Sequence, residues 1–282
     1  MAELLKGAPA AGALTERLRA ESDALRARGV TPTLAVVRVG ERDDDLAYER
    51  AARRRCEQCG VAARCLALPA DATQEALLRE LAALSGDDGV HGILLLRPLP
   101  PHLDDAAACG AIAPEKDMDG VTAASMAALY ALVGKGFAPC TAEACVALLR
   151  HYGVPLDARR VVVVGRSLVI GKPVSMLLLR ENATVTIAHS HTENLPELCR
   201  AADVLVVAAG KAGLVGAEHV RRGQTVIDVG IHAASDGTLC GDVRFDEAEP
   251  VVDAITPVPG GVGAVTTAVL CEHVIRAARG SA

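Results

Sequence analysis

Short apolar runs alternate with helix-like segments along this chain of 282 residues, and that alternation constrains its fold more than any other feature. Four consecutive valines at 161–164 are typical of a strand buried on both faces of a parallel sheet. Alternating strands and helices favour an α/β fold. By the same reasoning we expect strands at 34–39, 63–68, 92–96, 161–164, 184–187, 204–208 and 225–229, and helices at 14–28, 46–59, 73–84, 141–152 and 266–278.

The length of the chain favours two α/β domains, because 282 residues exceed the usual size of one hydrophobic core. The change between the two halves falls between Asp119 and Cys140. We expect the second half to form a nucleotide-binding type of sheet, with Thr141 capping its first helix. The last helix is expected to return to the first domain.

Composition narrows the class of protein and its partners. Hydrophobic residues make up 51% of the chain and charged residues 23%, which is enough apolar surface for a packed core. No run has the length of a membrane span and the first ten residues lack the layout of a signal peptide, so we expect a cytoplasmic protein without a membrane partner. The net charge of −6 and the lack of long basic runs argue against nucleic acid as a partner.

Two groups of residues suggest metal ligands, and we reject both. Cys56 and Cys59 have a spacing seen in zinc sites, but a second pair is missing and both lie in a predicted helix. Asp228, Asp242 and Asp246 are too far apart in sequence for a known ligand pattern. The nine cysteines are therefore read as reduced thiols and the aspartates as structural, and no metal is predicted.

A glycine-rich loop follows the valine strand. Gly165 ends the strand, and Gly171 and Pro173 open the next helix, whose backbone N–H groups could face an anion. The spacing differs from the usual Gly-x-Gly-x-x-Gly pattern, so a purely structural turn stays open as an alternative.

The strand after that loop bears on the choice of nucleotide. NAD-binding sheets place an acidic residue about twenty positions beyond the first glycine, where it binds the ribose. Here the segment 188–192 carries no carboxylate, whereas Arg166, Ser190 and His191 suit a ribose phosphate. We therefore favour NADP over NAD; the alternative is that Arg166 and His191 are ordinary solvated loop residues.

Several segments together resemble the methylenetetrahydrofolate dehydrogenase/methenyltetrahydrofolate cyclohydrolase family. They occur in the family's order over nearly the whole chain, and the last has two prolines and three glycines within eight residues. The segments are Val39-Gly40 with Tyr48, 92–94 through 98–100, 114–120, 139–141, 165–173, 189–192, 227–231, 241–243 and 256–263.

The resemblance implies an NADP-dependent enzyme of one-carbon metabolism, a homodimer whose subunits have two α/β domains with a folate-binding cleft between them. The N-terminal substrate domain would comprise residues 1–121 plus 264–282, and the Rossmann-like cofactor domain with its parallel sheet residues 122–263. Tyr48 and Asp119 match catalytic, substrate-binding positions of the family, and the loop residues Pro259, Gly260, Gly261 and Val262 would also contact substrate. The residues expected to bind the cofactor are Thr141, Gly165, Arg166, Ser167, Gly171, Pro173, Ser190, His191 and Ile231.

The chain departs from the family at two catalytic positions. Ala52 stands where the family has a lysine, one helical turn after Tyr48, and Leu96 stands where it has a glutamine. Arg55 returns to the Tyr48 face of the helix, but a guanidinium stays protonated and cannot act as a base. Arg97, next to the lost glutamine, should point to the opposite face of its strand. Ala264-Val265, where the family usually has Pro-Met, also alters the substrate pocket.

The two reactions of the family depend on these positions to different extents. Hydrolysis needs a group that takes a proton from water, whereas hydride transfer needs mainly alignment of the reactants. We therefore expect dehydrogenase activity to persist and cyclohydrolase activity to be weak or absent. Alternatives are a diverged paralogue acting on another pterin-like substrate and a non-catalytic folate- or nucleotide-binding protein. Tyr48 could also be a core aromatic, and Asp119 a helix cap.

Overall fold

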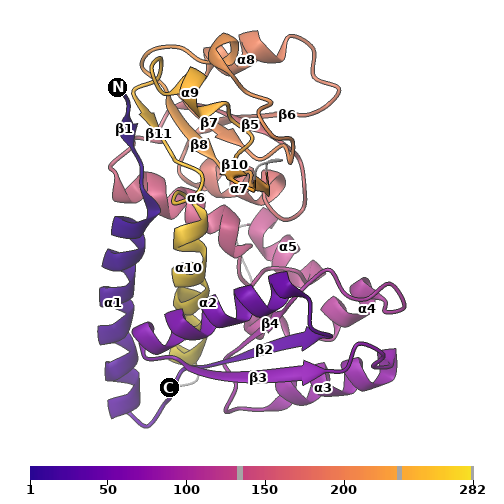
Figure 1. Ribbon diagram of the computed structural model, residues 1–282. Coiled ribbons are helices and arrows are strands. Elements are labelled where there is room, and N and C mark those ends of the chain that lie inside the picture. The colour runs from indigo at the N-terminus through magenta and orange to yellow at the C-terminus, as the bar shows by residue number, and fades with distance from the viewer. Residues whose placement is uncertain (132–135, 234–236, 281–282) are drawn as a thin grey trace. The chain divides into compact units, whose positions relative to one another are not determined.

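The computed structural model describes residues 1–131, 136–233 and 237–280 (Figure 1). They form two compact units: unit 1 comprises Met1–Ala11 and Thr141–Thr266, and unit 2 comprises Gly12–Cys140 and Thr267–Ala282. Relative to the predicted domains, unit 1 also takes in the first eleven residues, and unit 2 extends from residue 121 to Cys140. The domain boundaries given by the sequence stay a prediction.

Unit 1 contains the parallel sheet expected from the second half of the chain. The strand order is β1-β11-β8-β7-β5-β6, and every neighbouring pair is parallel. The α/β class with a Rossmann-like parallel sheet is thereby confirmed. The strands are β1 (Glu3–Leu4), β5 (Arg160–Val164), β6 (Thr184–Ala188), β7 (Val204–Val207), β8 (Thr225–Asp228) and β11 (Ala254–Ile255), and a separate antiparallel pair is formed by β9 (His232–Ala233) and β10 (Leu239–Cys240).

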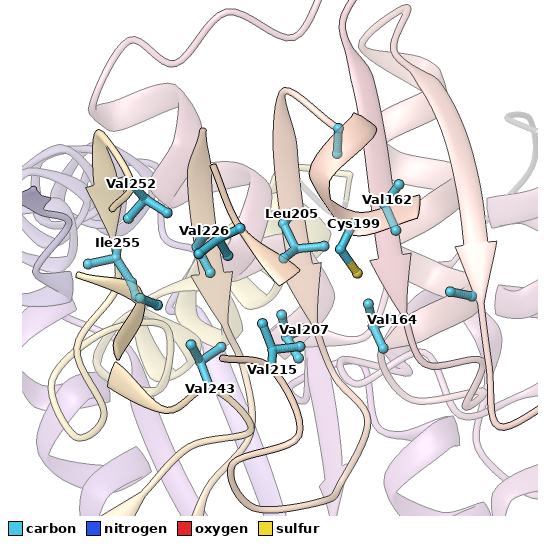
Figure 2. Packing of buried hydrophobic residues seen from close by; sticks show 14 residues of the cluster. Val162, Val164, Cys199, Leu205, Val207, Val215, Val226, Val243, Val252 and Ile255 are labelled. Carbon is cyan, nitrogen blue, oxygen red and sulfur yellow. The ribbon is translucent and has the colours of Figure 1, made fainter. Parts of the chain in front are cut away.

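The sheet of unit 1 is built on aliphatic side chains. All four residues of the valine run are buried, and Val162 and Val164 project into one cluster with Leu205 and Val207 of β7 (Figure 2). Alternate residues of a strand point to opposite faces, so the other two valines serve the opposite side. The helices of this part of the chain are α6 (Cys140–His151), α7 (Gly171–Arg180), α8 (Leu195–Ala201), α9 (Phe245–Ala248) and the 3-10 helix η2 (Ala217–His219).

Unit 2 contains a smaller parallel sheet with the order β3-β2-β4. Its strands are β2 (Thr33–Val39), β3 (Ala62–Leu68) and β4 (Gly92–Leu95). The helices are α2 (Asp43–Cys59), α3 (Gln74–Gly86), α4 (Asp105–Gly110), the 3-10 helix η1 (Pro114–Lys116) and α5 (Ala123–Ala131), together with parts of α1 (Gly7–Ala27) and α10 (Gly263–Arg279).

Local sequence signals explain where these elements begin and end. The Thr73 hydroxyl accepts a hydrogen bond from the Ala76 N–H and caps α3. Gly60 ends α2 in the left-handed region at φ 75°, which glycine adopts without strain. Strand β4 ends at Leu95, one residue before the predicted end, because Pro98 cannot donate a ladder hydrogen bond. The prediction that Thr141 caps α6 is wrong, since the helix already begins at Cys140.

Candidate active site

Tyr48 and Ala52 lie one helical turn apart on the inner face of α2. The Ala52 side chain is fully buried, as are Cys56 and Cys59 further along the same helix. Tyr48 is half-buried. Burial raises the pKa of the Tyr48 phenol well above its usual value, and the neighbouring Cys140, Asp119 and Cys271 raise it further. The phenol therefore stays protonated, and the groups that act on it are acidic.

Asp119 lies in a turn whose backbone is held by hydrogen bonds to the neighbouring Asp117 side chain. The two Asp117 carboxylate oxygens accept hydrogen bonds from the N–H groups of Val121 (3.0 Å) and Thr122 (2.8 Å). Asp119 Oδ1 accepts one from the Cys140 N–H at 3.1 Å. Asp119 thus caps α6, which was the structural alternative for this residue, and the same carboxylate also acts on Tyr48.

Several groups act on the charge of Asp119. Burial raises the pKa of its carboxyl above the ordinary range, and the carboxylate of Asp117 adds to that rise. The Cys140 N–H, the His273 ring and the Arg97 guanidinium lower the same pKa. Asp119 therefore titrates at a higher pH than an exposed aspartate, and its ionised form depends on these partners.

Leu96 belongs to the same side of the small sheet as α10. A Cβ placed on Gly92 would meet Met118 and the Val274 side chain of α10, so the even-numbered positions of β4 point toward that helix. Ile93 and Leu95 point the other way, into a cluster with Leu77 and Leu81 of α3. Leu96 is buried at 7% exposure, so an apolar side chain occupies this position, for which the family resemblance implies a glutamine.

Two basic side chains of unit 2, those of Arg55 and Lys116, bind partners other than Tyr48. The Arg55 guanidinium donates to the hydroxyls of Thr267 (3.3 Å) and Thr15 (2.9 Å). Lys116 Nζ donates to the carbonyl oxygens of Asp87 (2.7 Å) and Leu84 (3.4 Å). Within the described residues of unit 2, no lysine or arginine acts on the pKa of Tyr48.

Arg97 is a second basic residue that acts on Asp119, after His273. Its Nη1 forms an ion pair of 2.7 Å with Asp105 Oδ2 at the start of α4. The expectation that Arg97 points away from Leu96 stays a prediction. Burial lowers the pKa of the Arg97 guanidinium, but Cys109, Asp105 and Asp119 together raise it above its ordinary value. Arg97 is thus a fixed positive charge beside Asp119, and it is not a base.

Three residues at this site were missed by sequence reasoning. His273 is fully buried, and its Nδ1 donates a hydrogen bond of 2.8 Å to the Met118 carbonyl oxygen. The Cys140 sulfur lies 3.7 Å from the same nitrogen. Cys271 of α10 lies 3.9 Å from Cys56, sulfur to sulfur. The apolar periodicity of α10 predicted a buried face, but it did not single out His273 or Cys271.

In unit 1, the loop from β5 to α7 depends on its two glycines. A Cβ on Gly165 would overlap the Ala208 carbonyl oxygen, and one on Gly171 would overlap the Gly165 carbonyl oxygen. Gly165 also has φ 127°, which disfavours any other residue. The Ser167 hydroxyl accepts hydrogen bonds from the N–H groups of Ile170 (3.1 Å) and Gly171 (3.4 Å), so it caps the start of α7.

The residues predicted to select the nucleotide lie at one edge of this sheet. Val164 of β5 pairs with Ala188 of β6, so the residues that follow the two strands leave the sheet side by side. Arg166, Ser190 and His191 are all exposed there. The donor set fits a phosphate, and the glycines leave room for close approach of a nucleotide to the backbone.

The other predicted binding residues are located in three places. Pro173 is buried in the first turn of α7, Thr141 lies in α6, and Ile231 is 64% exposed between β8 and β9. The segment of Pro259, Gly260, Gly261 and Val262 precedes α10, and Gly260 accepts a hydrogen bond of 2.8 Å from the Gly7 N–H. Their roles stay predictions.

Asp228 and Asp242 of unit 1 accept hydrogen bonds from the backbone N–H groups of nearby loops. Asp228 accepts from the N–H groups of Gly230, Asp242 and Val243 at 3.0–3.1 Å. Asp242 binds the N–H groups of the loop 209–211 after β7 and the His232 ring nitrogen at 2.7 Å. Among residues 1–131, 136–233 and 237–280, no group of three or more His, Cys, Asp or Glu could hold a metal ion. No helix in those ranges is long and apolar enough to cross a membrane.

Comparison with known families assigns both parts of the chain. Residues 5–119 match the tetrahydrofolate dehydrogenase/cyclohydrolase catalytic domain, and residues 139–282 match the NAD(P)-binding domain of the same family. The Bifunctional protein FolD of Carboxydothermus hydrogenoformans is 49% identical over 98% of this chain and 97% of that protein. The Bifunctional protein FolD of Clostridioides difficile is 47% identical over 98% and 96%.

Solved structures agree with this assignment. The bifunctional enzyme FolD from Campylobacter jejuni superposes with a TM-score of 0.96 at 35% identity, covering 99% of both chains. The methylenetetrahydrofolate dehydrogenase-cyclohydrolase of Trypanosoma brucei, solved with NADP cofactor and an inhibitor, gives a TM-score of 0.91 at 40% identity over 99% of this chain and 98% of that one.

Proposed function

Because the chain belongs to the tetrahydrofolate dehydrogenase/cyclohydrolase family, we propose that it oxidises methylenetetrahydrofolate with NADP and hydrolyses the methenyl product weakly or not at all. The observation that carries the second half of this proposal is Ala52, a fully buried methyl group one turn from Tyr48. The oxidation half rests on family membership and on the glycine loop of unit 1.

The chain's own residues support NADP. Gly165 and Gly171 allow the backbone to approach a nucleotide, and Arg166 with Ser190 and His191 offers donors for a ribose phosphate. The absence of a carboxylate at 188–192 disfavours NAD, which that residue would bind through a ribose hydroxyl. When bound, NADP supplies the acceptor for the hydride. A relative from Trypanosoma brucei was solved with the same cofactor.

We assign Tyr48 and Asp119 to the folate. The Tyr48 phenol stays protonated and can donate a hydrogen bond or stack beside the pterin. The Asp119 carboxylate uses Oδ1 to cap α6, and we assign its remaining acceptor capacity to the pterin amino group. Both residues orient substrate, and alignment is the main requirement of hydride transfer.

Hydrolysis makes a different demand on the protein. A water molecule must lose a proton as it adds to the methenyl carbon, and a positioned general base typically contributes about 10²–10⁴-fold to such a step. Ala52 and Leu96 carry no group that can accept a proton. Arg97 is permanently charged, and its guanidinium is engaged with Asp105. None of Ala52, Leu96 and Arg97 can therefore act as the general base that the hydrolysis requires.

A second candidate function is the ordinary bifunctional one. Relatives at 47–49% identity are named bifunctional proteins, which favours both activities in this chain as well. Hydrolysis would then use a base other than a lysine at position 52. Product analysis separates the two candidates: purified protein is incubated with methylenetetrahydrofolate and NADP, and the folates are identified by mass spectrometry. Accumulating methenyltetrahydrofolate supports the proposal, and formyltetrahydrofolate formed at the rate of NADPH overturns it.

We also expect the subunits to pair as a homodimer, as the family resemblance implies. Sedimentation velocity at micromolar concentration should give the mass of two chains. A single-chain mass across the concentration range would contradict this expectation.

A further inference from the structure

A groove on unit 2 is lined by five arginines, three on α2 and two on α1. It has a volume of about 740 Å³, and its lining includes one acidic residue, Glu57. The arginines are Arg19, Arg26, Arg50, Arg53 and Arg54. All five are exposed, whereas Ala52 between them in sequence is buried, so the groove and the Tyr48 face lie on different sides of α2.

Contacts between the two helices hold the groove together. The Ser22 hydroxyl of α1 donates a hydrogen bond of 2.8 Å to the carbonyl oxygen of Gly60, the residue that ends α2. Arg19 donates to the Glu57 carbonyl oxygen at 3.4 Å. Residues 50, 53, 54 and 57 share one face of α2, and residues 19 and 26 lie two turns apart on α1.

The groove carries a local excess of positive charge on an acidic chain. Arg19 pairs with Asp23 at 3.2 Å. The other four arginines form no ion pair with any described residue. Like charges three and four positions apart repel one another on a helix, as Arg50 does with Arg53 and Arg54. With a net charge of −6 for the whole chain, this concentration of guanidinium groups favours a multiply charged anion.

The surroundings of the groove favour carboxylates over phosphates. Phosphate sites commonly use backbone N–H groups at helix N-termini, whereas this groove lies at helix C-termini: Gly60 ends α2 and Arg26 is in the last turn of α1. No aromatic side chain lines it, although single-stranded nucleic acid is usually held by base stacking. A guanidinium fork forms paired hydrogen bonds with a carboxylate or a phosphate, so the lack of N-terminal backbone donors and of aromatic side chains is what favours a carboxylate here.

We propose that this arginine groove docks an extended acidic segment of a partner protein. An extended peptide advances about 3.3 Å per residue and points alternate side chains to one side, so every second acidic side chain can face the arginines of the groove. The binding is independent of the proposed reaction, because none of the five arginines contributes to the Tyr48 or Asp119 contacts described above.

The test uses a fluorescein-labelled hexaglutamate peptide and the full-length protein, with binding followed by fluorescence anisotropy at low salt. The groove variant is Arg50→Gln/Arg53→Gln/Arg54→Gln. The matched control is Arg79→Gln/Arg180→Gln/Arg222→Gln, which removes the same charge from exposed arginines outside the groove. Thermal unfolding and dehydrogenase activity of both variants report that the fold is intact.

We expect the groove variant to bind the peptide at least about tenfold more weakly than the wild type and the control to stay within about twofold. Equal weakening in both variants, or no binding by the wild type, would overturn the proposal, because the attraction would then be general or absent. Tripolyphosphate or an oligothymidylate displacing the peptide at lower charge-equivalent concentration would also overturn it, in favour of a phosphate ligand.

Discussion

Asp119 Oδ1 accepts a hydrogen bond of 3.1 Å from the backbone N–H of Cys140, so one carboxylate both caps α6 and acts on the phenol of Tyr48. The cap fixes the position of the carboxylate, and burial raises its pKa. This relationship links the segment 114–120 to the start of α6. The site can therefore be tested by varying the pH through the pKa of Asp119.

We predict that Asp119→Asn removes the acid limb of the pH profile for kcat/KM of the dehydrogenase reaction. The pKa of Asp119 is raised, so the wild type loses its ionised acceptor as the pH falls through a value above the ordinary carboxyl range. The asparagine amide oxygen can still accept from the Cys140 N–H, which preserves the cap. Asp119→Ala should in addition cost about 1 kcal/mol of unfolding free energy. An unchanged acid limb in the asparagine variant would remove Asp119 from the reaction.

Arg97 should set the position of that acid limb. Its charge lowers the pKa of Asp119, so Arg97→Leu should move the limb to higher pH, while Arg97→Lys should leave it nearly in place. The measurement is kcat/KM against pH for the three proteins. A shift of equal size in the lysine variant would mean that packing against Asp105, rather than charge, is the property that matters.

Arg166→Ala should weaken NADP binding selectively. Loss of a hydrogen bond to a charged group costs about 1.5–3 kcal/mol, which corresponds to an increase of roughly 10- to 150-fold in the KM for NADP. The KM for NAD should change by less than about twofold, because the ribose hydroxyl offers Arg166 no charge to bind. Initial rates with both cofactors check this, and Arg180→Ala at the far end of α7 serves as control. Equal losses with both cofactors would contradict the assignment.

Asp228 should make the stability of the protein depend on pH. Burial and the nearby Asp242 carboxylate raise its pKa to about 7, against the effect of three backbone N–H donors. Since the folded-state pKa lies above the usual 3.8, the folded protein holds a proton that the unfolded chain releases. The contribution of Asp228 to stability is therefore largest below that usual value and is lost as the pH rises to about 7.

The measurement for Asp228 is the free energy of unfolding in urea between the two pKa values, for the wild type and Asp228→Asn. The wild type should fall more steeply with pH than the variant, by at most about 1.4 kcal/mol per pH unit for one proton. Parallel curves for the two proteins would show that Asp228 titrates alike in the folded and unfolded states.

Much of the fold could be predicted from local signals. The valine run fixed β5 because four β-branched apolar residues suit a strand buried on both faces, and Gly165 and Gly171 marked the loop because close backbone approach excludes a side chain. Thr73 gave the start of α3 correctly. These features depend on residues near one another in sequence.

The site could be predicted only in part, because several of its contacts join distant residues. The start of α6 was misplaced because its cap comes from Asp119, twenty-one positions earlier in the chain. Arg55 lies on the predicted face, but Thr15 and Thr267 bind its guanidinium, and neither carries a sequence signal for that contact. His273 was missed because a single histidine in an apolar helix gives no indication of its partner.

We infer that Ala52 and Leu96 leave hydrolysis without its proton acceptor while oxidation continues. Ala52→Lys/Leu96→Gln restores the two family residues, at some cost in stability because both positions are buried. The control Ala131→Lys adds the same charge at an exposed position of α5.

The decisive measurement is the enzyme-dependent decay of methenyltetrahydrofolate, corrected for its decay in buffer. We predict little or no decay beyond buffer with the wild type and the control, and an increase of about 10²-fold or more with the double variant. Rapid decay with the wild-type protein would show that another group accepts the proton and that both activities are present.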